Sequence, residues 1–419
     1  MTPTFSEALR VWWRIGLLSF GGPAAQIALM HREVVEQRGW LTEKQYLNAL
    51  SFCMLLPGPE AMQLATYAGW RLHGVRGGLA AGLAFVLPGA AVVLALSMIY
   101  AAFGQVPFVA ALFLGVKAAV LVIVIEALLR IAKRALTDRV AWWIAAGAFI
   151  GIFFLALPFP LIVLAAGLFG FIRAREATAE SSPKVATTPS ETLRTVTIWL
   201  AIWILPLAAL AAVLGREHLL ASLGWFFSKL AVVTFGGAYA VLAYMGQDVV
   251  TRHGWLEAGQ MMDGLGLAET TPGPLILVTE FVGYTAAHNA SGLSAGLAGA
   301  LVALWATFAP CFLWIFAAAP YVEWINAQPR LRGALSAITA AVVGVIANLA
   351  LWFALHVFFS EVTRSEIGPL TVWLPELASL EWRVVALALV SGYLLLWRHW
   401  SVPLVLAVSA ILALGVSLI

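Results

Sequence analysis

Long apolar runs dominate this chain, and short polar stretches separate them. The runs predict membrane-spanning helices at about 76–103, 107–129, 140–157 and 160–172, and again near 292–319, 333–359, 383–397 and 401–418. One further apolar run, about 195–214, stands between the two sets. The pattern therefore predicts an all-α polytopic membrane protein.

Shorter apolar segments precede each set, and glycine and proline interrupt them. Capping boxes at Thr4 and Thr42 predict the starts of two such helices. In the first half of the chain the four predicted pieces end near residues 19, 37, 56 and 72. Each piece has about 14 to 16 residues, or roughly 21 to 24 Å of helix, which is shorter than the ~30 Å hydrocarbon core. We therefore expect broken or re-entrant helices rather than independent spans.

The interrupted stretch occurs twice, 215 positions apart and without a gap. Phe20-Gly21-Gly22 returns as Phe235-Gly236-Gly237, and Pro57-Gly58-Pro59 returns as Pro272-Gly273-Pro274. This spacing indicates an internal duplication with one repeat in 1–172 and the other in 215–419. Helix-breaking backbone in an apolar setting is its most repeated feature.

Lysine and arginine gather in alternate loops, which predicts the orientation of the spans. The basic loops are 71–76, 130–139, 330–332 and the linker 173–194, and these are expected in the cytoplasm. The acidic loop 361–381 is expected outside. The extra helix 195–214 then inverts the second repeat. We predict two inverted-topology repeats, with a cytoplasmic N-terminus and a periplasmic C-terminus.

The composition supports this class of protein and excludes others. Hydrophobic residues make up 62% of the chain and charged residues 11%, whereas a soluble domain carries roughly a quarter charged residues. The net charge of +3 gives no reason to expect nucleic acid as a partner. Cys53 and Cys311 both lie in apolar segments and are expected to be buried thiols. No metal site, cofactor or cleavable signal peptide is predicted.

Broken helices inside a membrane offer a way to bind an anion. Their N-terminal ends expose unpaired backbone N–H groups and carry about half a positive charge, so they can hold an oxyanion. Inverted repeats with matching breaks point to a transporter whose site lies near the bilayer midplane. The competing interpretation is that glycine and proline merely kink packed helices.

Three basic residues in the apolar segments are candidate anion ligands. Arg14 and Lys229 are also 215 positions apart, so both copies carry a cation before the Phe-Gly-Gly break. Lys117, within the 107–129 span, is a second-line candidate. Such residues are costly in lipid and usually face a cavity or a partner. The alternatives are that Arg14 and Lys229 extend to the membrane interface and that Lys117 pairs with a carboxylate.

Polar residues near the proline-glycine-proline breaks are candidates for substrate contact and proton coupling. Gln63 and Thr271 could donate hydrogen bonds to an oxyanion. Glu60, Glu269 and Glu280 are candidate proton-coupling groups, because a buried carboxylate takes up a proton more readily. As an alternative, Glu60 caps its own helix and the threonine acts as an N-cap.

Several motifs together closely resemble the chromate transporter family in its long, two-domain form. They are Phe20-Gly21-Gly22-Pro23, Leu56-Pro57-Gly58-Pro59, Gly77-Gly78, Leu87-Pro88-Gly89 and Thr271-Pro272-Gly273-Pro274. The resemblance covers 5–172 and 215–419. It implies a bacterial inner-membrane protein that exports chromate, driven by the membrane potential or a proton gradient. Ala238 follows the second Phe-Gly-Gly, where the first has proline, so the two halves are not equivalent.

The sequence thus predicts a secondary transporter that moves a tetrahedral oxyanion, with chromate outward as the first choice. A sulfate or other oxyanion carrier is the second choice, because the two dianions have similar shapes. A non-transporting scaffold or a lipid-processing enzyme is the alternative of another class. An enzyme should show a nucleophile and base together, and the apolar segments offer no such pair. The expected partners are the oxyanion and the lipid bilayer, and the chain could act alone or as a homodimer.

Overall fold

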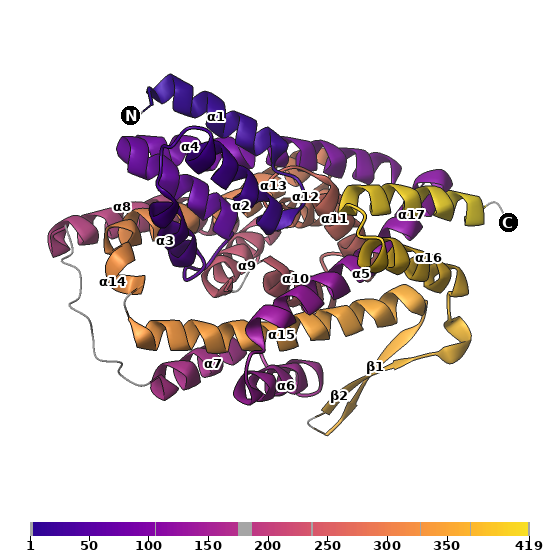
Figure 1. The fold of residues 1–419 in the computed structure, drawn as a ribbon. Helices are drawn as coiled ribbons and strands as arrows, with labels where there is room; N and C mark the ends of the chain where they lie inside the picture. The colour runs from indigo at the N-terminus through magenta and orange to yellow at the C-terminus, as the bar shows by residue number, and fades with distance from the viewer. Residues whose placement is uncertain are drawn as a thin grey trace. The chain divides into compact units, whose positions relative to one another are not determined.

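The computed structural model describes residues 3–104, 106–174, 187–235, 238–326, 328–368 and 370–417, and these are mostly helical (Figure 1). Among them, five helices are long and apolar enough to cross a membrane: Glu60–Phe103, Pro107–Ala135, Pro189–Leu214, Leu293–Ile325 and Pro329–Phe358. The prediction of an all-α polytopic membrane protein is confirmed. The inverted orientation of the repeats stays a prediction.

Contacts divide the chain into two compact units, and each draws on both halves of the sequence. The first unit comprises Met1–Ser97, Arg175–Ala238 and Thr271–Arg332, and the second comprises Met98–Ala174, Tyr239–Thr270 and Gly333–Ile419. The broken segments at Phe20, Pro57, Phe235 and Pro272 all belong to the first unit. The ordinary spans of both halves make up most of the second.

The first unit begins with short helices and continues into two long helical hairpins. Its elements are α1 (Phe5–Leu18), α2 (Gly22–His31), η1 (Arg32–Glu36), α3 (Glu43–Cys53), most of α4 (Glu60–Phe103), α8 (Pro189–Leu214), α9 (Leu219–Val233), η3 (Leu275–Leu277), α12 (Val278–Ser291), α13 (Leu293–Ala318), η4 (Ala319–Tyr321) and α14 (Val322–Asn326). The helix α3 ends at Cys53, three residues before the predicted end, because the chain is already turning toward Pro57.

Both hairpins close at a glycine and pack through a pair of glycines. Within α4 the backbone leaves the helix at His73 and Gly74, where Gly74 has φ 60°. Gly292, with φ 79°, separates α12 from α13 in the same way. A Cβ added to Gly283 would lie 2.5 Å from the carbonyl oxygen of Gly299. The absence of side chains therefore lets the two arms of this hairpin approach closely.

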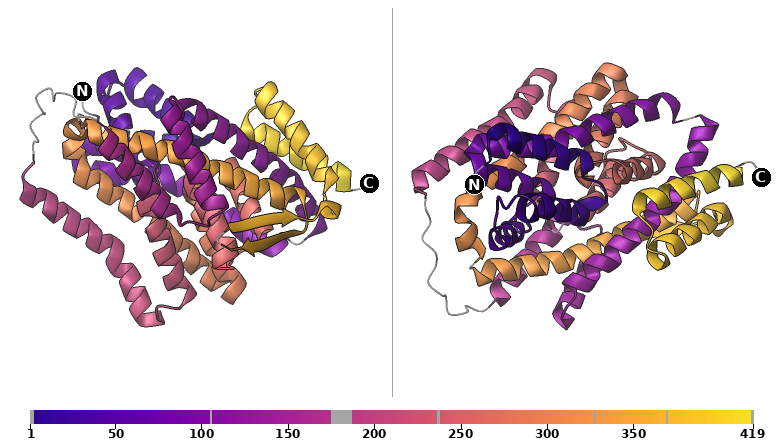
Figure 2. Two further views of the ribbon diagram at one scale, coloured as in Figure 1. Left: turned by 90° about the horizontal axis from the view of Figure 1, so that it is seen from below. Right: turned by 45° about the horizontal axis from the view of Figure 1, so that its top comes forward.

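The second unit surrounds α5 with helices from the C-terminal part of the chain. Its elements are α5 (Pro107–Ala135), α6 (Arg139–Phe153), α7 (Phe159–Arg173), all but the first residue of α10 (Ala238–Gln247), η2 (Asp248–Arg252), α11 (Ala258–Thr270), most of α15 (Pro329–Phe358), β1 (Val362–Ile367), β2 (Leu370–Pro375), η5 (Leu377–Ser379), α16 (Trp382–Gly392), η6 (Tyr393–Trp397) and α17 (Val402–Ser417). Helices α16 and α17 both pack on α5 (Figure 2).

The sequence analysis missed the antiparallel hairpin of β1 and β2. Its register pairs Val362 with Pro375 and Ile367 with Leu370. The segment lies in the acidic loop that was expected outside the membrane. Its charged residues interrupt the β-branched residues, so no pattern typical of a strand was seen. Gly368 follows β1 with φ 61°, a conformation that glycine readily adopts.

Candidate functional site

The broken segments of the two copies meet in the first unit and are hydrogen-bonded crosswise. The N–H of Gly58 donates to the carbonyl of Thr234 at 2.8 Å, and the N–H of Gly273 donates to the carbonyl of Ser19 at 2.9 Å. Ser19 and Thr234 are matching positions in the two copies, and so are Gly58 and Gly273. Each proline-glycine-proline loop is therefore bound to the Phe-Gly-Gly break of the other copy.

Local chemistry explains why the chain breaks at these points. The hydroxyls of Ser19 and Thr234 each donate a hydrogen bond to the carbonyl four residues earlier, that of Ile15 at 2.5 Å and that of Leu230 at 2.6 Å. These bonds satisfy carbonyl groups in the last turns of α1 and α9. Gly58 and Gly273 have φ values of 123° and 91°, which side chains rarely tolerate. The same local solution thus recurs in both copies.

Three helix N-termini surround a small cavity at these breaks. They are the starts of α2, of α4 and of the helix formed by η3 and α12. The lining residues are Pro23, Gln26, Pro59, Glu60, Ala61, Pro274, Leu275 and Ile276. The cavity has a volume of about 10 Å³, which is room for about one water molecule. Its surroundings suit negative charge because the N-termini of helices carry a partial positive charge.

Gln26 holds two of the breaks together and was missed by the sequence analysis. It is 1% exposed, and its Nε2 donates to the carbonyls of Gly273 at 2.6 Å and Ser19 at 3.2 Å. Because carbonyl oxygens only accept hydrogen bonds, these partners fix which end of the amide is nitrogen. The Oε1 atom is buried without a hydrogen-bond partner among the described residues. A glutamine among the apolar residues of this half-helix was the feature of the sequence that could have indicated its role.

The structure brings some of the predicted substrate contacts together. Pro23, Pro59 and Pro274 line the cavity, and Gly58 and Gly273 form the crossed bonds. Gln63 lies next to them, with its Nε2 donating to the carbonyl of Pro57 at 2.7 Å. Other predicted contacts are peripheral or buried elsewhere in the loops: Phe20 is 43% exposed, and Thr271 is buried. Gly236 and Gly237 lie outside the described residues.

The three candidate carboxylates have different surroundings. Glu60 lines the cavity at the start of α4. Glu280, on α12 in the first unit, is 1% exposed, and its Oε2 has no hydrogen-bond partner in the described part of the chain. Glu269, on α11 in the second unit, accepts a hydrogen bond of 2.8 Å from the hydroxyl of Tyr239. Glu60 alone of the three is among the residues that line the cavity.

The candidate cations lie apart from the cavity lining. Arg14 is 59% exposed, and its Nε lies 3.8 Å from Oε1 of the buried Glu33. Lys229 is exposed on α9. Lys117 belongs to the second unit, where its Nζ lies 3.5 Å from Oδ1 of Asp263. The expected alternative for Lys117, a carboxylate partner, is what the structure has.

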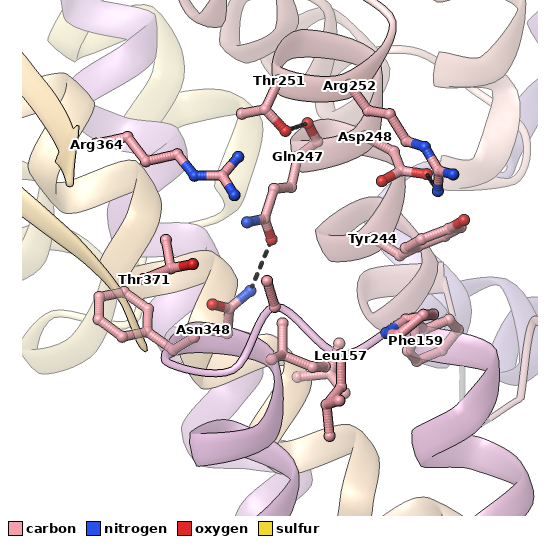
Figure 3. Close-up of a pocket in the computed structure, with 15 residues that line it drawn as sticks. Leu157, Phe159, Tyr244, Gln247, Asp248, Thr251, Arg252, Asn348, Arg364 and Thr371 are labelled. Carbon is pink, nitrogen blue, oxygen red and sulfur yellow. Dashed lines mark hydrogen bonds and ion pairs between the residues drawn. The ribbon is translucent and has the colours of Figure 1, made fainter. Parts of the chain in front are cut away.

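A larger pocket lies within the second unit (Figure 3). It measures about 340 Å³, and its polar lining includes Gln247, Asp248, Arg252, Asn348 and Arg364. Each arginine is paired with a carboxylate: Arg252 with Asp248 at 4.0 Å, and Arg364 with Glu366 at 3.0 Å. These pairs leave little net positive charge with which to select an anion. The cavity at the breaks is therefore the better candidate for an anion site.

Comparisons with known proteins agree with the resemblance seen in the motifs. The family model described as "Chromate transporter" matches residues 6–171 and 221–414. A chromate transport protein of Cupriavidus metallidurans is 33% identical over 357 residues, which are 84% of this chain and 83% of the relative. A chromate transport protein of Pseudomonas aeruginosa is 34% identical over 370 residues, 86% of this chain and 82% of the relative.

A more distant relative matches almost the whole chain. It is an uncharacterised transporter of Methanocaldococcus jannaschii, 28% identical over 394 residues, with 91% of this chain and 92% of the relative covered. No solved structure matches this chain. Because the relatives are named as transport proteins, the prediction of a transporter rather than an enzyme is confirmed.

Proposed function

Since this chain belongs to the chromate transporter family, we propose that it is a secondary active transporter that exports chromate across the bacterial inner membrane. Chromate is a tetrahedral dianion, and its export would give the cell resistance to it. The observation that carries the proposal is the crossed pair of hydrogen bonds beside a cavity ringed by three helix N-termini. This arrangement offers backbone donors to an oxyanion without a cationic side chain in the lining.

Transport through this site needs the crossed bonds to open. The cavity of about 10 Å³ has room for about one water molecule, so a tetrahedral ion enters only when the loops move apart. Opening frees the N–H groups of Gly58 and Gly273, which then point to the ion in place of the carbonyls of Thr234 and Ser19. Hydrogen bonds to the ion thus take the place of the crossed hydrogen bonds, which lowers the free-energy cost of opening.

The membrane potential favours the export of chromate in either protonation state. One elementary charge crossing a potential of 100 mV corresponds to about 2.3 kcal/mol, so a monoanion leaving a negative interior releases about 2.3 kcal/mol and a dianion about 4.6 kcal/mol. If protons are also moved, Glu60, Glu269 and Glu280 are the candidates to carry them. Arg14 and Lys229 would raise the local concentration of anions near the breaks.

The direct test is flux through purified protein in liposomes. We expect chromate uptake or release that depends on an imposed membrane potential or pH gradient. Protein-free liposomes and liposomes with the Gly58→Val variant, which cannot keep the positive φ of this loop, serve as controls. If neither chromate nor sulfate moves under either gradient, the transporter proposal fails.

Sulfate is the competing substrate, because helix termini recognise charge and tetrahedral shape, which the two dianions share. Both ions are offered in the same flux assay as competitors. We expect chromate to be moved in preference. Stronger inhibition by sulfate than by chromate would favour a sulfate carrier.

A further inference from the structure

We propose that the site takes the oxyanion in its singly protonated form, a hydrogen oxyanion with one O–H group, and that Gln26 is the residue that recognises this group. The inference rests on the proposed function and goes beyond it, because it states which protonation state of the substrate is bound. It also supplies a means of telling chromate from sulfate, which helix termini and shape do not.

The first step is the direction of the Gln26 amide. Its Nε2 donates to the carbonyls of Gly273 and Ser19, from breaks in opposite copies. Both partners can only accept, so either carbonyl alone is enough to keep the amide from turning around when the loops move apart. The Oε1 atom is therefore held in a defined direction, buried and without a hydrogen-bond partner among the described residues. The residue that carries it lines the cavity.

The second step is what such an acceptor requires. A buried acceptor that faces another acceptor makes no hydrogen bond and is left with the full cost of its desolvation. A fully deprotonated oxyanion presents only acceptors. A hydrogen oxyanion presents one O–H donor, which can be given to Oε1 of Gln26. Its remaining oxygens can still accept from the N–H groups at the helix N-termini.

The third step is the carboxylate of Glu60 in the same lining. Coulomb's law makes the repulsion of a dianion by this carboxylate twice that of a monoanion at the same distance. Glu60 and Gln26 thus disfavour the same species for separate reasons. The second copy has no glutamine at the matching position, where Val241 stands, so this selection belongs to one side of the duplicated site.

The consequence for the substrate follows from acid strength. The second ionisation of chromic acid falls near neutral pH, so the hydrogen form of chromate is abundant there. The hydrogen forms of sulfate and selenate are much stronger acids than that of chromate, so near neutral pH both ions are almost fully deprotonated. Selenate matches chromate in shape and size. A comparison of the two ions therefore distinguishes recognition of the protonation state from recognition of shape and size.

The test is equilibrium binding to the full-length protein in detergent, with chromate, sulfate and selenate measured between pH about 6 and about 8. We expect the affinity for chromate to rise as pH falls, in proportion to its hydrogen form. Chromate should also bind at least about tenfold more tightly than selenate at the lower pH. A chromate affinity that does not change with pH, or selenate binding equal to chromate binding, would overturn the inference while leaving oxyanion transport intact.

The Gln26→Met variant assigns the effect to this residue. It keeps the length of the side chain and removes the acceptor, so the preference for chromate over selenate should fall several-fold, leaving only the part due to the charge of Glu60. The Asn348→Leu variant removes a buried amide of the second unit (3% exposed) and should leave that preference unchanged. An unchanged preference in Gln26→Met would show that Gln26 only clamps the loops. Wild-type protein that neither binds nor transports any of the three ions would instead refute the proposed function.

Discussion

Glu60 begins α4 beside the cavity, where two roles compete for its carboxylate. If it carries a coupling proton, Glu60→Gln should abolish the pH dependence of chromate flux in liposomes while the protein still folds. The exposed Glu7, in the first turn of α1, offers a matched control at another helix start, and Glu7→Gln should keep the wild-type profile. A Glu60→Gln protein with an unaltered profile would leave this residue as a helix cap.

Arg14 and Lys229 give a second prediction for single residues. Each lies on the helix that precedes a Phe-Gly-Gly break, and both are exposed. Replacement of either by glutamine should lower chromate flux, with little change in the amount of folded protein, because it removes a charge that attracts the anion. Flux equal to that of the wild type would identify both residues as membrane-interface anchors.

His31 gives a pH-dependent prediction for stability. It lies outside the candidate spans, with its Nε2 2.7 Å from Glu43 and its Nδ1 3.1 Å from Glu36. The hydrogen bond to Glu43 is the largest cause of a pKa raised above 6.5, against an opposing effect of burial. The folded state thus favours protonated His31, so its stabilisation is complete below pH about 6.5 and is lost as pH rises through the higher folded-state pKa.

The corresponding measurement compares thermal unfolding of the wild type and His31→Gln at several pH values. The wild type should be more stable at acidic pH by less than about 1 kcal/mol, because its partners are exposed. The difference should shrink as pH rises. A difference that grows toward alkaline pH would contradict the assigned ion pairs.

At the scale of elements, the hairpin of α12 and α13 depends on the lack of a side chain at Gly283. Gly283→Ala places a methyl group 2.5 Å from a backbone oxygen of α13, and it should destabilise the protein by about 1–3 kcal/mol. Gly147 on α6 has no atom within 4 Å of an added Cβ. Gly147→Ala should therefore be neutral or slightly stabilising, and equal effects on the midpoint of thermal unfolding would contradict the packing argument.

The elements themselves could largely be predicted from the sequence, because apolar length and helix-breaking residues act locally. The breaks near Phe20 and Pro57 and the turn at Gly74 are of this kind. The β1–β2 hairpin was missed because its strands are short and interrupted by charge. Gln26 and Asp263 were missed for another reason: their partners, Gly273 and Lys117, are distant in sequence, so only the folded chain brings them together.

At the scale of the whole molecule, the predicted inversion of the two repeats can be tested by labelling. Cys53 and Cys311 are both fully buried, so they should give little background. Lys133 and Asn289 are exposed. Lys133 belongs to a basic segment that is expected in the cytoplasm, and Asn289 belongs to a segment without lysine or arginine that is expected outside. A membrane-impermeant maleimide added to intact cells should label Asn289→Cys and not Lys133→Cys. Labelling of both, or of Lys133→Cys alone, would contradict the predicted topology.

The crossed bonds of Gly58 with Thr234 and of Gly273 with Ser19 have a consequence for the gene as well as for the protein. In each copy one backbone N–H group and one backbone carbonyl make these hydrogen bonds with the other copy. A polypeptide carrying one copy would therefore need a companion, whether an identical molecule or the product of a neighbouring half-length gene. Two such halves, translated separately in the same cell, should assemble into what the fused gene encodes as a single chain.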